Sequence, residues 1–406
     1  MKKIFIILFI LLQYLIFPQE LKKTTYIEAN VIKNDLDYFC YLSFRVQYNA
    51  LVFVKDDTKY KSGFSLNFEI CDSNKTIKRE IIKRQVEVNN YEITNSNDSG
   101  IVGLMVIDLP KGKYTIKPYL ELNNTSITLP QEPILFDLEA KSDSICSRPI
   151  IVQEGLELMD LVNYGGYIPY SDNKYDLVIP IFDKSVKEIN IDIIQNKESI
   201  YSKKIQNPSN NYYSFFENVN AISIKSDSSK KEVNLFKIEN LSSIIDEGVI
   251  DISVKVDNKV FSYSYIVKWF NKPKCLEFPE LAIKSLGLFM NKDIVSELLN
   301  NNSDNYYIEL KKVWNKYFPS PNTKYNKKML EFYNRVDYAW EKFPAIGKKG
   351  GDSDRGIIYI KYGSPDKIER TYTERDNTVE VWYYEKIDKQ FVFEDKTGLG
   401  NFTLLK

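Results

Sequence analysis

Apolar and polar residues alternate with a period of two along much of the first 140 residues, as they do in strands that have one buried face. The clearest alternating runs cover residues 41–48, 63–70 and 100–122. Residues 109–112 read Leu-Pro-Lys-Gly, which is the composition of a tight turn, so the last run is expected to form two strands. The pattern predicts an immunoglobulin-like β-sandwich over residues 20–140.

A second group of alternating runs follows after an interval. These runs cover residues 175–182, 188–194, 248–257 and 260–269. Only Asn258 and Lys259 separate the last two runs, and a connection of this length suits a β-hairpin. We therefore predict a second immunoglobulin-like β-sandwich over residues 147–270.

The spacing of apolar residues changes after residue 270. They then recur three and four positions apart, which is the period of an amphipathic helix. The widest apolar stripe is formed by Met329, Phe332, Tyr333, Val336, Ala339, Trp340 and Phe343. Such a stripe predicts a helix that packs against a core, and residues 271–345 as a whole are expected to form a helical connector.

After residue 350 the period returns to two. The alternating runs cover residues 355–362, 378–385, 390–394 and 401–405. Turn-length segments join most of them, so residues 346–406 are expected to form an antiparallel meander with the preceding helices on one face. The predicted fold class is therefore multidomain and mainly β: two immunoglobulin-like β-sandwiches, a helical connector and a C-terminal α+β antiparallel meander.

Charge and composition narrow the possible functions. The 406 residues include 55 Lys and Arg, 55 Asp and Glu, and no His. Because the net charge is zero, no overall field attracts nucleic acid, and we expect no nucleic-acid partner. The lack of histidine excludes His-based zinc sites and Ser-His-Asp or Cys-His catalysis. Carboxylate pairs of the glycosidase kind, lysine nucleophiles and cation sites with oxygen ligands remain open.

The first 19 residues have the pattern of a secretory signal peptide. Lys2 and Lys3 precede an apolar run over residues 4–17. This run is shorter than the roughly 20 residues needed to span a bilayer, so a cleaved signal is favoured over a retained anchor. We therefore expect an exported protein, located in the periplasm or associated with the outer membrane or cell surface, with no membrane span after the signal peptide.

Export would place the four cysteines in an oxidising compartment, where disulfides are allowed. These residues are Cys40, Cys71, Cys146 and Cys275. Cys40 and Cys71 both lie in strand-like runs of the first predicted sandwich, so they are the favoured disulfide pair. The alternative is that all four are separate buried thiols, which behave as small apolar residues.

The strongest candidate for a binding or catalytic site is the segment 350–369. It begins with Gly-Gly-Asp-Ser-Asp-Arg-Gly and continues with an apolar run. A phosphate-binding loop is disfavoured because the glycines precede a predicted strand instead of a helix. An EF-hand is disfavoured because Gly363 stands at position twelve, where the bidentate Glu is required. Asp354 and Asp366 lie at opposite ends of the predicted strand, about 35 Å apart if it is extended, so they do not form an acid–base pair.

A structural role suits this cluster best. Asp354 can accept hydrogen bonds from backbone amides, Arg355 can pair with a neighbouring acid, and a turn that ends at Asp366 can terminate the strand. The edge of this element remains available for recognition. We therefore name Asp354, Arg355, Asp366 and Tyr383 as candidate binding residues, and expect no catalytic residue, metal or cofactor.

Residues 269–405 contain an ordered series of motif positions: Trp269, Pro273, Trp314, Pro321, Thr323, the helix Phe332-Tyr333-Asn334-Arg335-Val336, Asp354-Arg355-Gly356, Tyr362-Gly363-Ser364-Pro365-Asp366 and Trp382-Tyr383-Tyr384. In this series the chain resembles a known family of exported bacterial proteins, named after its GWxTD motif. The motif itself is altered, because Gly351 stands where the family has Trp. The resemblance implies an envelope protein with β-sandwich domains ahead of this module, and it implies no reaction.

These observations favour a non-catalytic binding or assembly protein that contacts a protein partner in the cell envelope. If Trp382 and Tyr384 face the helices, strand alternation directs Val381 and Tyr383 to the other face of the sheet, where a partner can bind. The alternative function is a carboxylate-dependent hydrolase that acts on a glycan or peptide in the envelope. The sequence leaves the oligomeric state open.

Overall fold

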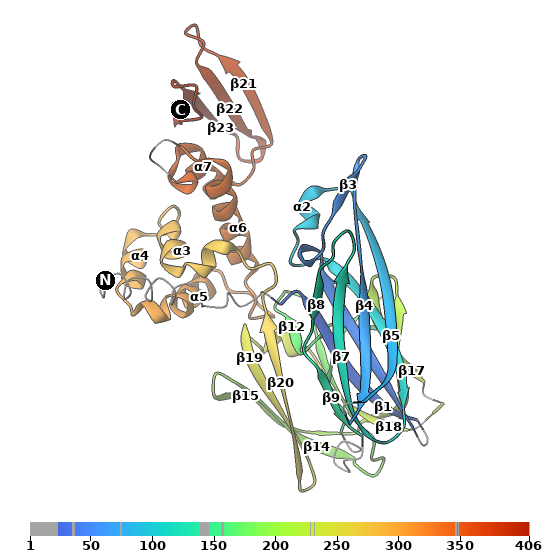
Figure 1. Ribbon diagram of the computed structural model, residues 1–406. Coiled ribbons are helices and arrows are strands. Elements are labelled where there is room, and N and C mark those ends of the chain that lie inside the picture. The colour runs from blue at the N-terminus through green and yellow to red at the C-terminus, as the bar shows by residue number, and fades with distance from the viewer. Residues whose placement is uncertain are drawn as a thin grey trace, which may run out of the picture. The chain divides into compact units, whose positions relative to one another are not determined.

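The computed structural model describes residues 23–405, except for residues 35–36, 74, 139–145, 156–157, 228, 231, 346 and 348 (Figure 1). The predicted signal peptide, residues 1–19, lies outside this part. Strands hold 49% of the described residues and helices 21%, so the predicted mainly β class is confirmed. The chain divides into two compact units, and the second consists of residues 170–173, 242–246 and 269–406.

The N-terminal part of the first unit contains two antiparallel sheets that share a hydrophobic core. One sheet has the order β1 (Thr25–Asn34), β2 (Asp37–Gln47), β6 (Gly100–Leu109). The other contains β3 (Val54–Asp56), β4 (Lys59–Asp72), β5 (Lys75–Val88), β7 (Lys113–Leu122), β8 (Thr128–Pro130) and β9 (Ile134–Asp137). The predicted turn after Leu109 is confirmed.

The later part of the first unit has a different topology. One sheet closes on itself through β10 (Ile150–Glu154), β11 (Met159–Leu161), β17 (Ala221–Asp227), β16 (Ser209–Asn218), β18 (Val233–Ile238) and β13 (Asp176–Ile181). A five-stranded sheet has the order β12 (Tyr167–Pro169), β20 (Lys259–Lys268), β19 (Gly248–Val256), β14 (Glu188–Gln195), β15 (Glu198–Gln206). Strands β13, β14, β19 and β20 lie where the alternation predicts them, and no run was named for the other strands of this part. The immunoglobulin-like arrangement stays a prediction.

Strand β1 is covered on both faces. Ala29 and Val31 pack against the N-terminal core, while Glu28 and Asn30, on the opposite face, are also buried. Alternate side chains point to opposite faces of a strand, so a strand buried on both faces lies between two layers. The ring of Tyr41 on β2 lies 5.2 Å from that of Phe215 on β16. The two β-rich parts of the first unit therefore pack directly against each other.

A buried ion pair joins these two parts. The carboxylate of Glu28, only 3% exposed, accepts hydrogen bonds from Arg148 Nε and Gly166 N, each at 2.5 Å. The Arg148 guanidinium also lies 4.4 Å from the centre of the Tyr265 ring on β20. A buried charge is tolerated only when it is paired and hydrogen-bonded, and both oxygens of Glu28 have a donor.

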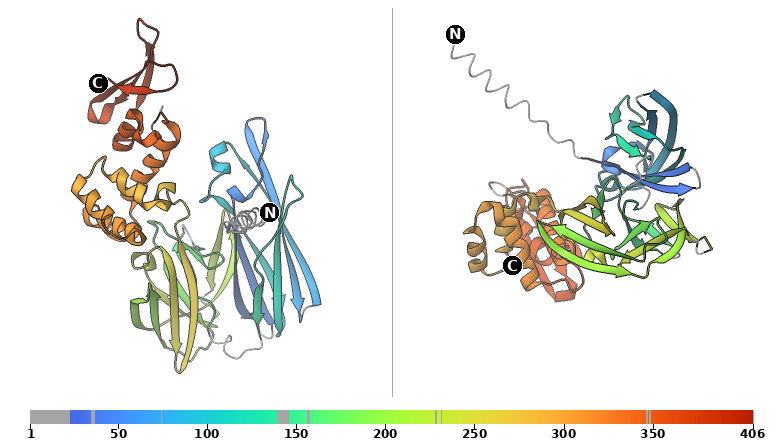
Figure 2. Two further views of the ribbon diagram at one scale, coloured as in Figure 1. Left: turned by 60° about the vertical axis from the view of Figure 1, so that its left-hand side comes forward. Right: turned by 90° about the horizontal axis from the view of Figure 1, so that it is seen from below.

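The second unit is α+β. Its helices are α3 (Pro279–Leu286), α4 (Lys292–Leu299), α5 (Tyr306–Tyr317), α6 (Lys327–Lys342) and α7 (Asp354–Tyr362). Its sheet is an antiparallel meander in the order β21 (Lys367–Tyr372), β22 (Thr378–Tyr384), β23 (Lys389–Asp395), β24 (Phe402–Leu404), as Figure 2 shows at the C-terminal end. The predicted meander and the apolar stripe of α6 are confirmed.

The prediction of a strand over residues 355–362 is wrong, because these residues form helix α7. Ser353 caps the helix: its Oγ accepts from Gly356 N at 3.1 Å. Gly363, with φ at +83°, ends it. The β-branched residues Ile357, Ile358 and Ile360 favour a strand locally, but the cap and the packing of the helix on the sheet outweigh that preference. No strand was predicted for β21, because its residues are exposed and show no apolar alternation.

The cysteines are all buried free thiols in the structure. Cys40 lies on β2 and Cys71 on β4, which belong to different sheets, so the bond predicted between them is not formed. Burial raises the pKa of the Cys40 thiol well above its ordinary value. Within the described residues, no helix is long and apolar enough to cross a membrane.

We predict that Arg148→Met lowers the free energy of unfolding of the first unit by about 3–5 kcal/mol, because the Glu28 carboxylate is then buried without its partner. The measurement is urea unfolding followed by fluorescence. The double variant Glu28→Gln/Arg148→Met is expected to be more stable than Arg148→Met, because it buries no charge. As a matched control, Lys204→Met removes the exposed pair with Glu188 and costs less than about 1 kcal/mol. Equal losses in the single and double variants would contradict the role of the pair.

Candidate functional site

The glycine-rich cluster lies where α6, the 3₁₀-helical turn Gly350–Asp352 and α7 meet in the second unit. A Cβ atom at Gly356 would lie 1.9 Å from Gly350 O, and one at Gly351 would lie 2.0 Å from Nε1 of Trp340 on α6. The Gly356 contact is with a backbone atom, so no side chain fits there without moving the chain, whereas the Gly351 contact is with the Trp340 side chain, which would have to move. Gly356 therefore allows α7 to pack closely on the turn Gly350–Asp352, and Gly351 leaves room for the indole of Trp340.

Asp354 and Arg355 begin α7 and connect it to strand β24. Asp354 Oδ2 accepts a hydrogen bond from Leu404 N at 2.8 Å. Arg355 donates from Nη2 to Gly400 O at 3.3 Å, and its guanidinium lies 3.9 Å from the centre of the Phe402 ring. The predicted roles of these two residues, acceptor for a backbone amide and partner for an acid, both agree with the structure.

The acid that pairs with Arg355 is Glu380 on β22, and it is 2% exposed. One of its oxygens, Oε2, accepts from Arg355 Nη1 and from Trp382 Nε1, each at 3.2 Å. The other, Oε1, accepts from Arg370 Nε at 2.9 Å. Burial lowers the pKa of Arg355 from its ordinary value, and Glu380 opposes that shift. This carboxylate is the electrostatic centre of the site.

Glu380 is not among the site residues predicted from the sequence. The sequence nevertheless contains an indication of its role. Glu380 is two positions before Trp382 on the same strand, so it points to the same face, which was expected to lie against the helices. A charge at an inward-facing position of a strand needs a partner of opposite charge. Arg355 was not recognised as the partner of Glu380, because residues 355–362 were predicted as a strand instead of a helix.

A second buried acid, Asp395, organises the turn between β23 and β24. Its carboxylate accepts from the backbone N–H groups of Thr397 at 3.0 Å, Gly398 at 3.1 Å and Gly400 at 2.7 Å. Burial acts to raise the pKa of Asp395, but these hydrogen bonds outweigh burial and hold the pKa below its ordinary value. This turn also positions Gly400 O to accept the hydrogen bond from Arg355.

The four predicted binding residues do not converge on one site. Asp354 and Arg355 lie together in the first turn of α7. Asp366 lies beyond the other end of that helix, where its Oδ2 accepts from Glu385 N at 2.8 Å. Tyr383 faces away from Trp382 and donates from its hydroxyl to Glu369 Oε2 at 2.8 Å. The first pair stabilises the module, whereas Asp366 and Tyr383 lie at its surface.

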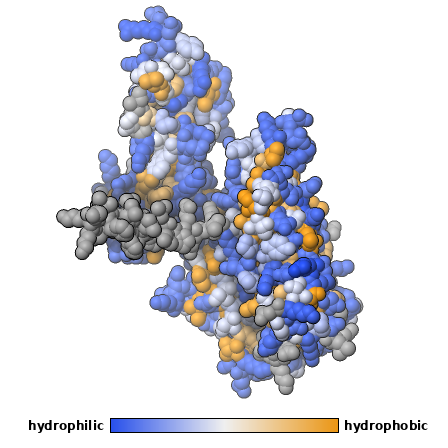
Figure 3. Space-filling view, in the orientation of Figure 1, coloured by the Kyte–Doolittle hydropathy of each residue, from blue (hydrophilic) through white to orange (hydrophobic). Residues whose placement is uncertain are grey.

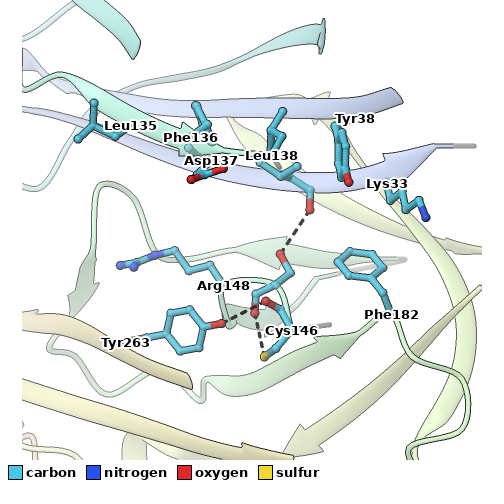
Figure 4. Close-up of a pocket in the computed structure, with 13 residues that line it drawn as sticks. Lys33, Tyr38, Leu135, Phe136, Asp137, Leu138, Cys146, Arg148, Phe182 and Tyr263 are labelled. Atoms are coloured by element: carbon cyan, nitrogen blue, oxygen red, sulfur yellow. Dashed lines mark hydrogen bonds between the residues drawn. The ribbon is translucent and has the colours of Figure 1, made fainter. Parts of the chain in front are cut away.

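A cavity of about 190 Å³ lies in the first unit (Figure 4). It is lined by Ala29, Val31, Lys33, Tyr38, Leu135, Phe136, Asp137, Leu138, Cys146, Ser147, Arg148, Phe182 and Tyr263. The Tyr263 hydroxyl donates to Cys146 O at 3.2 Å, and burial raises the pKa of the Cys146 thiol to about 11, so the thiol stays protonated at neutral pH. Ligand pockets usually have about 300–1,000 Å³, so this cavity is a packing gap at the junction of the sheets.

In the described ranges no three His, Cys, Asp or Glu side chains are placed to hold a metal ion. Residues 255–404 match the family model of the GWxTD domain. The matched range begins in β19, ends in β24 and contains the whole α6–α7 crossing. A search of the curated proteins found no match.

We predict that Gly351→Trp destabilises the second unit by about 1–3 kcal/mol or more, because the indole of Trp340 already occupies the space above residue 351. Thermal unfolding measures the loss. The double variant Trp340→Ala/Gly351→Trp is expected to recover part of it, with Trp340→Ala as the control. If the double variant is no more stable than Gly351→Trp, the contact between these two positions is not the cause.

We also predict a pH dependence for Asp395. Its folded pKa lies below the unfolded value of about 3.9, so its stabilising effect is complete above that value and is lost as the pH falls through the folded pKa. Asp395→Asn is expected to cost about 1–3 kcal/mol at neutral pH. The difference from wild type should shrink below about pH 4, measured by urea unfolding across a pH series. Asp388→Asn, in an exposed turn, serves as the control; a pH-independent difference for Asp395→Asn would contradict the assignment.

Proposed function

The chain contains a GWxTD domain over residues 255–404, and from this premise we propose that it acts as a non-catalytic binding or assembly protein of the cell envelope. The domain contacts a protein partner through the face of its sheet that is opposite α7. The predicted signal peptide over residues 1–19 supports export to the periplasm or the cell surface. The proposal includes immunoglobulin-like folds for the β-rich regions that precede the domain.

The observation that favours docking is the alternation along β22. Trp382 and Tyr384 are buried against α7 and Phe343, with ring centres of Phe343 and Trp382 5.3 Å apart. Val381 and Tyr383 point to the opposite face and are only partly buried. Val392 on β23 lies directly opposite Val381 and is also partly buried.

The composition of this second face suits a protein partner. Its apolar centre, Val381, Tyr383 and Val392, is bordered by the exposed residues Lys367, Glu369 and Gln390. An apolar patch with a polar rim is typical of an interaction surface. The patch is small, so a transient contact is favoured over an obligate one.

The arrangement of the buried acids supports binding over the hydrolase alternative. A hydrolase of the glycosidase kind needs two carboxylates that face a substrate. Glu380 is engaged by Arg355, Arg370 and Trp382, and Asp395 is engaged by the backbone of its own turn. Both groups thus stabilise the fold of the module.

We predict that Tyr383→Ala and Val392→Asp weaken association with an envelope partner while the melting temperature stays near that of wild type. Trp382→Ala, in contrast, is expected to cost about 3–5 kcal/mol and unfold the module, because its side chain is 1% exposed. Association is measured by cross-linking in envelope fractions, and stability by thermal unfolding. Leu399→Ala, at a 74% exposed position in a turn, is the control for an apolar truncation elsewhere. A Tyr383→Ala variant as unstable as Trp382→Ala would show that both faces are buried.

A further inference from the structure

Strand β21 is the outer strand of the C-terminal sheet and carries an uncovered edge (Figures 1 and 2). Among the described strands of the second unit it pairs with β22 alone. All six of its residues are exposed, and Ile368 is 49% exposed. The free N–H and C=O groups of such an edge are a template for the addition of another strand.

The charges along this edge have an unusual order. Around Ile368 they run Asp366 (negative), Lys367 (positive), Glu369 (negative) and Arg370 (positive). Each charged residue thus has a residue of opposite charge the same number of positions away on the other side of Ile368. We propose that a second copy of this chain adds to β21 in antiparallel orientation, with the two-fold axis at Ile368, and so forms a homodimer with one continuous sheet.

The proposed register follows from strand geometry. In an antiparallel pair, side chains that lie directly opposite each other point to the same face of the sheet. When the two strands are copies of one sequence, the two-fold axis normal to the sheet must therefore pass between the two copies of a single residue. An axis at Lys367, Glu369 or Arg370 would place two identical charges opposite each other, which is destabilising. With the axis at Ile368, Lys367 lies opposite Glu369 of the second copy, and Asp366 lies opposite Arg370 of the second copy.

Lys367 and Glu369 are already paired with each other within one chain, while Asp366 also accepts a hydrogen bond from Glu385 N at 2.8 Å. Lys367 Nζ lies 2.6 Å from Glu369 Oε1 within one chain, on the face opposite α7. Pairing two copies would therefore form a ring of four alternating charges. On the other face, Arg370 is held by Glu380 at 2.8 Å and stays 71% exposed, and the two copies of Ile368 meet between the charged pairs.

The contact is short, so we expect a weak dimer. Five residues from each copy bury much less surface than the roughly 1,200–2,000 Å² of stable complexes. Its cross-strand ion pairs are exposed, so salt should weaken it. The inference concerns the edge of the sheet and does not depend on the envelope partner proposed for its face.

Sedimentation velocity of the full chain over a concentration series tests the proposal. Wild type is expected to dimerise with rising concentration, and less so at high salt. Lys367→Glu and Glu369→Lys each place like charges opposite each other, so each variant alone should lose affinity by about tenfold or more. An equimolar mixture of the two variants restores opposite charges at both positions and should form heterodimers.

The double variant Lys367→Glu/Glu369→Lys should dimerise as wild type does, since it reverses both charges and keeps them complementary. Thermal unfolding of each variant checks that the module stays folded. Three outcomes would overturn the proposal: a wild-type chain that is monomeric at every concentration, single variants with unchanged affinity, or a mixture that stays monomeric.

Cysteine cross-linking tests the register separately. In the proposed dimer the two copies of residue 368 lie directly opposite, about 4.5–5.5 Å apart between Cα atoms, which a disulfide can span. Ile368→Cys is therefore expected to form a covalent dimer on oxidation. The two copies of residue 372 would be about 26 Å apart along the strands, so Tyr372→Cys should remain uncross-linked. The reverse result would overturn the register.

Discussion

Burying a carboxylate requires hydrogen-bond donors for both of its oxygens, and each unit of this protein is organised around one such group. In the first unit, Glu28 draws Arg148 and Gly166 to β1 and so joins two β-rich regions. In the second, Glu380 draws Arg355 from α7 and Arg370 from β21 to the central strand β22. In both cases the ion pairs link separate elements of the unit, so they favour one packing of those elements.

The glycine and aspartate cluster owes its composition to packing. Gly350 allows the turn to approach the backbone of α6, and Gly356 allows α7 to pack on that turn. Asp354 and Arg355 attach the last strand, and the carboxylate of Glu380 neutralises the buried guanidinium. Because the polar groups of the motif are engaged inside the module, the two interactions that we propose use its surface instead. That surface has two parts, the partly apolar face around Tyr383 and the charged edge of β21.

The strands with a clear apolar alternation were predictable, because a strand with one buried face imposes a period of two on its own residues. The helix α6 was predictable for the same reason, at a period of 3.6. Helix α7 was not, since its Ile residues fit a strand equally well and only the Ser353 cap and the sheet beneath it decide the outcome. The closed pairing of β10 with both β11 and β13 also depends on contacts between residues far apart in the chain.

For the candidate site, the sequence by itself determined the local chemistry: that alternate positions of β22 face opposite sides of the sheet, that Arg355 can pair with an acid, and that Asp354 can accept hydrogen bonds from backbone amides. Only the tertiary structure decided that the acid is Glu380, that Cys40 and Cys71 lie in different sheets, and that Asp354 and Asp366 lie at the two ends of a helix. The physical reason is that alternation and capping act between near neighbours in the chain. Which buried charges meet, by contrast, is set by how whole sheets and helices pack, and the favoured packing is the one in which these charges find partners.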